Sequence, residues 1–373
     1  MAPTGTIEAE RDSAMSGFLL RLGEFRGRLE IELADFFDRK LREVSEEPES
    51  RELVEEVRRL VTGGGKRLRP ALVYQTYRAC GGDSDEAVLP LAMSSELLHT
   101  YLLIHDDIMD HSEMRRGQPS AHARFKEIHQ ARGRPGDGAD FGRSVAILLG
   151  DLAHTWAVEL YASARSSLGD ESENGRALDT AFSGMCEEVI RGQYLEMLLP
   201  YEPDPTEDQL LRALRLKSGR YSVERPIQLG ALLAGAPTGA LAALARYGRA
   251  VGEVFQLQDD VLGTFGDADA VGKPVASDLI EGKYTFLIHR TLGLAEAGEA
   301  KELRAMLGRQ DLGEEEASRA REIILKSGGL EAVSQMIEER LEDARSALEE
   351  APLRSGDHGF LEGLIDYSGH RDR

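Results

Sequence analysis

The sequence has 373 residues, of which 41% are hydrophobic, so the chain is long enough to bury a large core in one or two domains. Its 45 basic and 66 acidic residues give a formal net charge of −21, and no long Lys/Arg cluster is present to follow a phosphate backbone. Nucleic acid is therefore not an expected partner. The only two cysteines, Cys80 and Cys186, show neither CxxC spacing nor a Cys/His cluster, so we expect two buried thiols rather than a zinc site or disulfide framework.

Residues 1–16 carry acidic side chains and no basic region followed by an apolar run, so we expect a disordered tail rather than a targeting segment. The most apolar stretches, such as 145–149 and 229–236, are interrupted by Gly, Asp or Pro well short of a bilayer-spanning length. These features predict a cytoplasmic protein without stable membrane insertion.

Apolar residues recur at three- and four-residue steps in segments 18–37, 89–108, 178–199, 210–233 and 241–262, which indicates helices. Alternating strand patterns are scarce, and glycine- and proline-rich breaks separate the periodic segments. Residues 126–143 form the longest polar, glycine-rich interruption, typical of a flexible surface loop. We expect one helical domain over residues 17–352 and a partly disordered C-terminal segment, 353–373.

An acidic motif, DDIMD, ends the apolar segment SSELLHTYLLIHDDIMD. The spacing places Asp106, Asp107 and Asp110 on one side of a helix, where adjacent turns can present oxygens to a hard cation. Magnesium keeps several waters and bridges phosphate oxygens, so a few carboxylates suffice. Taken alone, the motif is equally consistent with the acidic end of a helix in a very acidic protein.

A second acidic pair, Asp259 and Asp260, follows the apolar segment VFQLQ. Burying adjacent carboxylates costs several kcal/mol unless a cation compensates, so these surroundings favour a metal site. Gln256 lies one turn before Asp260 and is placed either to bind a ligand or to orient the acids.

A basic counterpart, GGGKRLRP, occupies residues 63–70. Its glycines let backbone approach an anion, and Lys66, Arg67 and Arg69 supply charge and forked donors suited to diphosphate oxygens. The spacing is not that of a P-loop. The alternative is a basic turn before a helix.

Further basic groups lie near the acidic motifs in the sequence. Arg115 and Arg116 come shortly after Asp110, where anion-binding groups would serve a metal-bridged diphosphate. His99 precedes Asp106 by two helical turns and so lies on the same face. The remaining candidates for binding a diphosphate are Lys217, Ser218, Lys273 and Lys283. Each of these residues, taken singly, is typical of a solvated surface or of helix packing.

Together, these residues resemble the trans-prenyltransferase family, the polyprenyl or geranylgeranyl diphosphate synthases. The motifs run in order as GGKRLRP, HDDIMD, RRG, GD at 150–151, GQ at 192–193, KSGRYS, FQLQDD, GKP and DLIEGK, between about residues 20 and 350. The resemblance implies an all-α isoprenoid-synthase fold, a helical bundle around a deep central cavity, with the acidic motifs facing each other across its mouth. It also implies a homodimer and three magnesium ions per active site.

The resemblance also implies roles for individual residues. Asp106, Asp110 and Asp259 would bind magnesium, with Asp107 and Asp260 supporting them. Isopentenyl diphosphate would be held by Lys66, Arg69, His99 and Arg116. The allylic diphosphate would be held by Arg115, Lys217, Ser218, Gln256, Lys273 and Lys283, of which Arg115 and Lys217 would also assist catalysis together with the acids.

The sequence departs from the family pattern at two positions. Gly263 stands where many relatives have a third aspartate, which puts the third ligand of the second cluster in doubt; the nearest later acid is Asp267. Ser218 replaces a more usual threonine but keeps the hydroxyl.

Product length would depend on the side chains below the first acids. Tyr101 and Leu102 lie five and four residues before Asp106, roughly 6–8 Å deeper along the helix axis. An aromatic residue at that position resembles the geranylgeranyl-forming pattern, so we expect a twenty-carbon product. The alternative for Tyr101 is plain core packing.

Two alternative functions share the fold. A class I terpene cyclase would need no second diphosphate site, and the GGKRLRP motif together with His99 argues against it. A regulatory, non-catalytic subunit of a hetero-oligomeric synthase would be free to lose its acidic and basic residues, and nearly all are present here.

Overall fold

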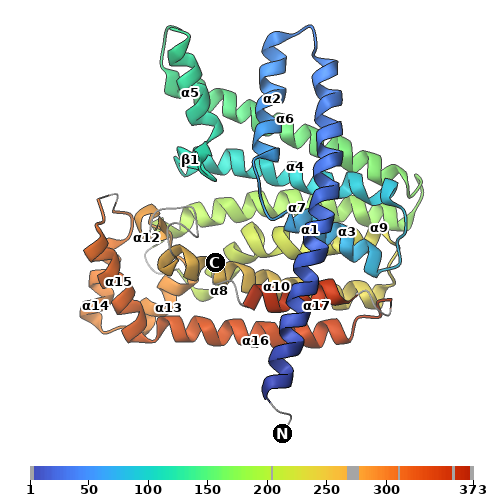
Figure 1. The fold of residues 1–373 in the computed structure, drawn as a ribbon. Coiled ribbons are helices and arrows are strands. Elements are labelled where there is room, and N and C mark those ends of the chain that lie inside the picture. Colours follow the sequence, from blue (N-terminus) through green and yellow to red (C-terminus); the bar gives the residue numbers. More distant parts are fainter. Residues whose placement is uncertain (1–3, 203–204, 267–276, 310, 355–357, 370–373) are drawn as a thin grey trace.

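The structure is a computed structural model that describes residues 4–202, 205–266, 277–309, 311–354 and 358–369, with side chains described from Ala14 onward. The described chain is built almost entirely of helices, which confirms the all-α class (Figure 1). The exception is a short antiparallel hairpin of β1 (Met114–Arg115) and β2 (Gln118–Pro119), which pairs Met114 with Pro119.

The helices in chain order are α1 (Thr4–Glu43), α2 (Pro48–Thr62), α3 (Leu68–Ala79), α4 (Asp85–Met109), α5 (Ala121–Ala131), α6 (Gly138–Ser166), α7 (Glu173–Leu198), the 3₁₀ turn η1 (Leu199–Tyr201), α8 (Glu207–Leu214), the π-helix η2 (Arg215–Glu224), α9 (Arg225–Leu233), α10 (Thr238–Phe265), α12 (Ser277–Glu281), α13 (Phe286–Leu294), α14 (Ala297–Met306), α15 (Glu314–Ser327), α16 (Gly329–Glu349) and α17 (Gly359–Gly369).

Side-chain caps fix where several helices begin. Ser84 Oγ accepts a hydrogen bond from the Ala87 backbone N–H at 3.2 Å at the start of α4, and Ser172 does the same for Gly175 at the start of α7. At the start of α8, Thr206 and Gln209 form a reciprocal capping box. The helix starts are therefore encoded locally.

All five periodic segments are helical, as predicted, but the structure differs from the sequence expectations in three places. Segment 210–233 is divided into α8, η2 and α9, so a π-helix stands where regular periodicity was expected. Segment 126–143 is not a long loop, because α5 and α6 fill it except for residues 132–137. Helix α1 begins at Thr4, which contradicts a disordered tail over residues 1–16 for its described part.

One continuous set of buried apolar side chains extends from Phe18 to Ile365. Helix α17 belongs to it, because the ring centroids of Phe360 and Phe18 lie 4.8 Å apart in a tilted arrangement and the Tyr247 hydroxyl donates to the Leu361 carbonyl at 2.7 Å. The C-terminal segment is therefore ordered from 359 to 369. The domain limits 17–352 remain a prediction.

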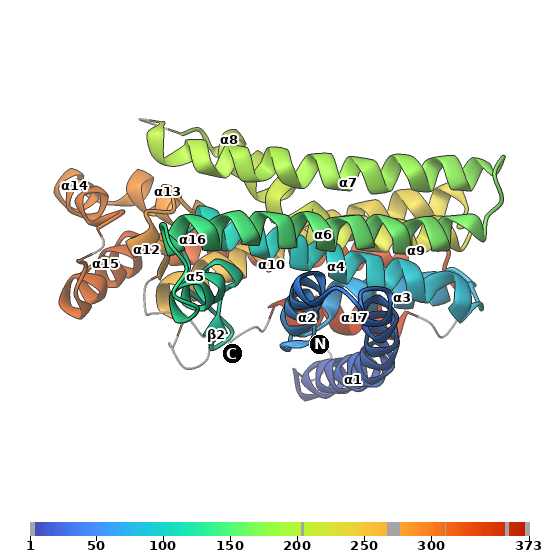
Figure 2. The same cartoon turned by 90° about the horizontal axis from the view of Figure 1, so that it is seen from above.

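The helices that end at the acidic motifs pack in the middle of this arrangement. Helix α4 packs along α6, α10 packs against both η2 and α16, and α17 packs on α1. Seen from above, α6 and α7 lie on the side of the molecule opposite α1 (Figure 2).

Glycines permit two close backbone approaches around η2. A Cβ on Gly192 of α7 would lie within 2.5 Å of the Leu216 carbonyl carbon, and one on Gly252 of α10 would lie 2.8 Å from the Gly219 carbonyl carbon. No larger residue fits these contacts without movement of backbone. Gly192 of the GQ motif thus permits the close approach of η2 to α7.

Within the described part of the chain, two helices, α4 and α6, are long and apolar enough to cross a membrane by length and composition alone, so the expectation that no stretch reaches that length is wrong. The apolar window of α4 is 72% buried inside the protein, which explains its hydropathy as that of a core helix. The window of α6 is 44% buried, and its exposed residues include both apolar side chains, such as Ile147 and Leu148, and charged ones, such as Asp151.

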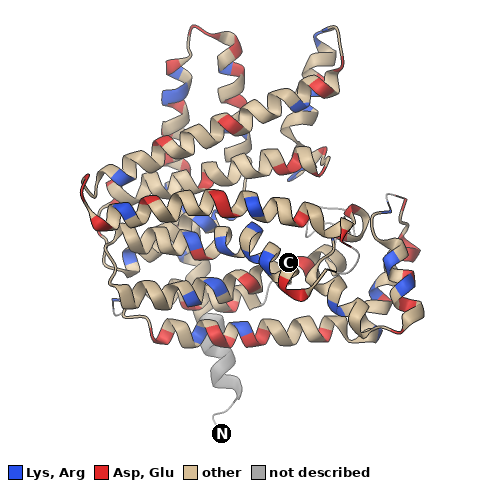
Figure 3. Cartoon of the chain, turned by 180° about the vertical axis from the view of Figure 1, so that it is seen from behind, with Lys and Arg blue, Asp and Glu red and all other residues tan. Residues whose placement is uncertain are grey.

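Cys80 and Cys186 are both free and half-buried, and burial raises the pKa of each thiol to about 11. Acidic and basic residues intermingle on the face seen from behind (Figure 3). The absence of a nucleic-acid partner stays a prediction that this distribution supports.

We predict that Gly192→Ala lowers the free energy of unfolding by about 1–3 kcal/mol, because the added methyl must displace the backbone of η2. Urea denaturation followed by circular dichroism measures the change. The matched control is Gly184→Ala on the same helix, where the methyl would meet only Arg225 Nη2 at 3.6 Å. That control should be neutral or up to about 1 kcal/mol more stable, and equal destabilisation of both variants would contradict the close-approach argument.

Candidate active site

Two acidic clusters lie at the C-terminal ends of α4 and α10, and Lys283 lies between them. Its Nζ is 3.9 Å from Asp110 Oδ2 at the end of α4 and 3.9 Å from Asp278 Oδ1 on α12. Asp278 in turn lies against α10, because a Cβ placed on Gly263 would be 2.5 Å from its Cγ. The ends of the two helices therefore meet at one site.

The first cluster contains one braced carboxylate and two that face the site. Arg115 Nε donates to Asp107 Oδ1 at 2.6 Å, and the Asp107 side chain is 4% exposed. Asp106 Oδ1 lies 3.5 Å from Lys217 Nζ in an ion pair, and among the described residues this buried oxygen accepts no hydrogen bond. Burial raises the pKa of Asp110 to about 6, and the charge of Asp106 adds to the effect. The anionic form of Asp110 is therefore disfavoured, which a bound cation would relieve.

The second cluster also contains a braced carboxylate, Asp260. Its Oδ1 accepts a hydrogen bond from Gln256 Nε2 at 2.9 Å, and its Oδ2 accepts one from the Phe286 backbone N–H at 3.3 Å. Burial raises the pKa of Asp260 to about 8, and the charges of Asp278 and Asp259 add to it. Asp260 thus joins α10 to the start of α13, and Gln256 orients this acid. Asp259 is half-buried beside it.

Two lysines compensate the acids. Lys217, on η2, is paired with Glu196 of α7 and lies near Asp106. Lys283 lies 2.7 Å from Glu281 Oε2. Burial would lower the pKa of each lysine, but the neighbouring carboxylates raise it overall, so both stay charged. Ser218 is half-buried next to Lys217, where the π-helix widens the backbone.

The basic motif at residues 63–70 forms a separate group near the start of α3. Arg69 Nη2 donates to Ser222 Oγ at 2.6 Å, and its Nη1 lies 3.4 Å from His99 Nε2. The Tyr221 hydroxyl lies 2.6 Å from His99 Nδ1. Burial and the nearby guanidinium of Arg69 hold the pKa of His99 well below its usual range. His99 is therefore a neutral hydrogen-bonding group.

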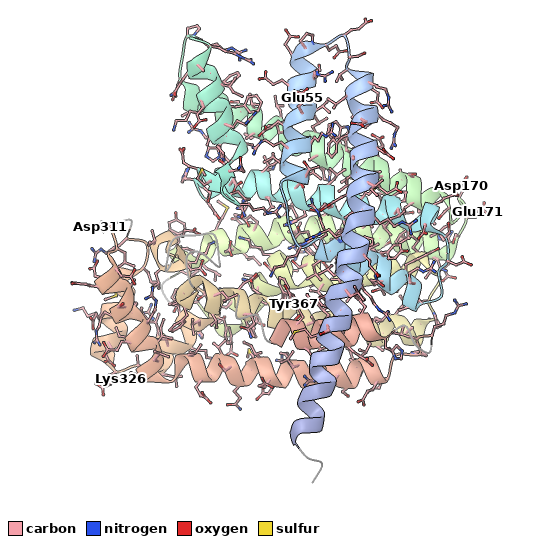
Figure 4. All side chains as sticks on the ribbon, in the orientation of Figure 1. Glu55, Asp170, Glu171, Asp311, Lys326 and Tyr367 are labelled. Carbon is pink, nitrogen blue, oxygen red and sulfur yellow. The ribbon has the colours of Figure 1, made fainter. Side chains whose placement is uncertain are left out.

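The glycines of this motif make room for Arg116. Gly64 and Gly65 have φ values of 97° and 132°, and the Gly64 carbonyl accepts a hydrogen bond from Arg116 Nη1. A Cβ on Gly65 would lie 3.1 Å from the Arg116 guanidinium nitrogens. Lys66 is exposed, with Nζ 5.3 Å from the ring centroid of Tyr367 on α17, which Figure 4 labels. The structure therefore brings Arg116 to the basic motif.

One prediction for this motif is wrong. Arg67 does not offer its donors to a ligand, because it is 1% exposed and its Nη1 donates to Glu96 Oε1 at 2.5 Å. Its Nη2 donates to the Val61 carbonyl at 2.7 Å. Arg67 therefore links α4 to the end of α2 and stabilises the backbone that carries the motif.

Tyr101 and Leu102 are half-buried on α4, below the first acids. The Tyr101 ring centroid lies 4.9 Å from that of His105, edge to face, and 5.0 Å from that of His154 on α6. Burial raises the pKa of Tyr101. Its ring is therefore held by two neighbours rather than free to swing aside.

Sequence reasoning missed four polar residues of the site. Tyr221 and Ser222 stand inside the motif KSGRYS and Asp278 inside DLIEGK, so the motifs contained them without distinguishing their roles. Glu196 follows GQ at 192–193 by one turn, and only the packing of α7 on η2 brings it to Lys217. Lys273 lies outside the described residues.

A cavity of about 310 Å³ lies elsewhere, between η2, α10 and α16. Arg215 and Arg340 line it, and their Nε atoms donate to buried Glu253 at 2.6 and 2.7 Å. These arginines are thus used in an ion-pair network that joins three helices. The acids of the two clusters do not line this cavity.

The first cluster fits a divalent cation. The buried, unsatisfied Asp106 Oδ1 is an oxygen that such a cation would satisfy. Among the described residues, no three His, Cys, Asp or Glu side chains gather closely enough to hold a metal ion by themselves. Magnesium takes few protein carboxylates, because waters and phosphate oxygens complete its shell.

A family model described as "Polyprenyl synthetase" matches residues 50–324. A short chain isoprenyl diphosphate synthase of Methanocaldococcus jannaschii is 36% identical over 270 residues, 72% of this chain and 75% of that protein. A geranylfarnesyl diphosphate synthase of Aeropyrum pernix is 34% identical over 310 residues, 83% of this chain and 91% of that protein. A geranylgeranyl pyrophosphate synthase of Corynebacterium glutamicum, solved with isoprenyl diphosphate and magnesium, is 32% identical with a TM-score of 0.81, covering 97% of this chain and 99% of that one. The all-α isoprenoid-synthase fold is thus confirmed.

Proposed function

The chain belongs to the polyprenyl synthetase family and is a prenyltransferase, and from this premise we propose that it condenses isopentenyl diphosphate with an allylic diphosphate, farnesyl or shorter, to give geranylgeranyl diphosphate. One observation carries the proposal: two acidic clusters and two sets of cationic donors meet around the ends of α4 and α10. A prenyl transfer between two diphosphates needs such paired charge.

The two groups of donors suit two substrates. Lys66, Arg69 and Arg116, with neutral His99, surround the glycine turn and would bind isopentenyl diphosphate. On the other side, the allylic diphosphate would accept from Lys217, Lys283 and Arg115, which already lie beside the carboxylates. The donors also hold the two reactive carbons in fixed relative positions.

The reaction follows from this charge distribution. The C1–O bond of the allylic substrate breaks, the diphosphate leaves with the electron pair, and the isopentenyl double bond forms the new C–C bond at C1. Loss of a proton to the released diphosphate completes the step. Asp106, Asp110 and Asp259 would hold magnesium, which would neutralise the charge of the leaving diphosphate. The lysines add charge stabilisation and need no proton transfer, because the carboxylates keep them protonated.

We predict that Asp106→Asn or Asp259→Asn lowers kcat/KM at least about 100-fold, because leaving-group charge is no longer neutralised. Labelled isopentenyl diphosphate, each shorter allylic diphosphate and magnesium are incubated with the enzyme, and the products are sized. The control is Asp343→Asn on α16, whose side chain is 61% exposed and remote from the acids. Near-normal rates in both variants would falsify the assigned roles.

The same assay separates the alternatives. Turnover of an allylic diphosphate without isopentenyl diphosphate would indicate a terpene cyclase. Activity only with a second chain would indicate a regulatory subunit. The donor group around Arg69 and His99 favours the two-substrate reaction, because a cyclase has no second diphosphate for it to bind.

The proposal of a twenty-carbon product rests on Tyr101. Its ring packs against His105 and His154 and would close the space that holds the growing chain. We predict that Tyr101→Ala shifts most of the product to lengths above twenty carbons, because the growing chain can pass the position of the ring. Chromatographic product sizing measures the shift. Tyr101→Phe keeps the ring and should keep the product, while an unchanged distribution in Tyr101→Ala would make Tyr101 plain core packing.

We propose that the chain forms a homodimer and that α6 and α7 provide the subunit interface. Exposed apolar residues recur along one face of α7 at Ile190, Tyr194 and Met197, which are 54%, 62% and 50% exposed. On α6, Ile147 and Leu148 are 47% and 58% exposed. Several exposed apolar side chains on neighbouring helices are typical of a subunit interface.

We predict that Ile190→Glu weakens self-association at least about 100-fold, because a charge would be buried in the interface. Sedimentation velocity measures the mass in solution. Ile31→Glu on α1, where the isoleucine is 64% exposed, is the matched control and should remain a dimer. A wild-type protein that sediments as a single chain at micromolar concentration would contradict the dimer.

The number of three magnesium ions and the cytoplasmic location stay predictions. Atomic-resolution density with substrate and metal would count the ions, and fractionation of the source cells would locate the protein.

A further inference from the structure

The cavity of about 310 Å³ between η2, α10 and α16 collects positive charge on a chain whose formal net charge is −21. Four arginines line it, against two acids, Glu253 and Asp343. The four are Arg215, Arg246, Arg249 and Arg340. The lining therefore carries more positive than negative charge, opposite to the balance of the whole protein.

Regular helices place these side chains. Arg246, Arg249 and Glu253 follow one another on α10 at steps of three and four residues, so they share one face of that helix. Arg340 and Asp343 are three residues apart on α16, which packs along α10 (Figure 1). The π-helix η2 adds Arg215. The charged groups are thus held by packed helices and not by a loop.

The ion pairs of the cavity use only part of its hydrogen-bonding capacity. The Nε atoms of Arg215 and Arg340 donate to the two oxygens of Glu253, whose side chain is 3% exposed. Within the described part of the chain, the terminal nitrogens of Arg215 donate no hydrogen bond. Glu253 therefore orients two guanidinium groups and leaves donors of Arg215 unused.

Arg249 is not needed for this network. Its side chain is exposed at the cavity and, among the described residues, forms neither an ion pair nor a hydrogen bond. Arg246 pairs with Glu350 at the surface, where both side chains are more than half exposed. Guanidinium groups of like charge that line one cavity repel each other, and a bound anion would relieve that repulsion.

The lining also indicates the class of anion. Guanidinium forks match the oxygens of phosphate groups. Apart from Ala250 and Ala347, every lining residue is polar or charged, so the cavity offers little apolar surface to a prenyl chain. Its volume is at the lower end of the range of small-molecule sites, about 300–1,000 Å³. A small, hydrophilic phosphate compound fits this cavity better than an isoprenoid substrate does.

We propose that this cavity is a second anion site, separate from the active site, and that it binds a phosphate or diphosphate group. Glu253 positions Arg215, and Arg249 supplies a guanidinium without a protein partner. The bound anion would join η2 to α10 and α16. Lys217 follows Arg215 by two residues, and Asp260 follows Glu253 by two helical turns, so the anion would stabilise the packing that carries both.

The test measures anion binding by isothermal titration calorimetry in metal-free chloride buffer, with inorganic phosphate and pyrophosphate as the probes. Arg249→Gln should weaken pyrophosphate binding at least about tenfold or remove one ion per chain, because a charge-assisted contact is lost. Arg249→Lys should bind with intermediate affinity, since it keeps the charge without the fork. Arg51→Gln on α2, where the arginine is 48% exposed, is the matched control and should bind as the wild type does.

A variant of the active site separates the two places where pyrophosphate can bind. Lys66→Gln alters the exposed lysine of the glycine turn and should retain the site that Arg249→Gln lacks. In Lys66→Gln, pyrophosphate should raise the melting temperature, and adding Arg249→Gln should remove that rise. Tighter binding of pyrophosphate than of phosphate would identify a diphosphate as the ligand group, and equal binding would identify a single phosphate group.

Three outcomes would overturn the proposal. The first is equal binding by the wild type and Arg249→Gln, or an equal loss in Arg249→Gln and Arg51→Gln. The second is binding that only Lys66→Gln removes, which would place the anion in the active site and leave the proposed function standing. The third is no binding of either anion by the wild type at millimolar concentration. The prenyl-transfer assay tests the proposed function separately, because it does not depend on this cavity.

Discussion

The site depends on the cost of holding several carboxylates together in a partly buried space. Lys217 Nζ lies 3.5 Å from Asp106, and Lys283 Nζ lies 3.9 Å from both Asp110 and Asp278, so these contacts are longer than tight ion pairs. Burial, followed by the nearby charge of Asp106, disfavours ionisation and raises the pKa of Asp110 to about 6. Cations and a diphosphate together would satisfy acids and lysines at once, so the free protein holds an electrostatic arrangement that is completed by its substrates.

The packing of η2 allows this arrangement. Lys217 reaches the first cluster because α7 and α10 approach η2 closely at Gly192 and Gly252. The π-helix then offsets the side chains relative to those of α8 and α9, so successive residues of KSGRYS serve both donor groups. Lys217 lies toward Asp106, whereas Tyr221 and Ser222 lie toward His99 and Arg69. One short segment therefore links the two proposed substrate sites.

Sequence reasoning predicts what is local and misses what only tertiary contacts decide. The helices and the positions of Asp106 and Asp110 follow from periodicity and turn spacing, because an α-helix fixes which residues share a face. The burial of Arg67 does not follow, since its neighbours in GGKRLRP look alike and only Glu96 across the core selects it. The place of Asp278 is equally hidden, because residues 264–277 separate it from Gly263 in the sequence.

The adjacent acids of each motif have different tasks, and this explains why they come in pairs. Neighbouring residues of a helix point about 100° apart, so two consecutive carboxylates cannot face one ion equally. Asp107 is braced by Arg115, and Asp260 is braced by Gln256 and the Phe286 backbone. Each brace ties the end of its helix to a following segment. The preceding acid of each pair is then positioned by a fixed helix end, because preorganised ligands bind a cation without the cost of ordering them first.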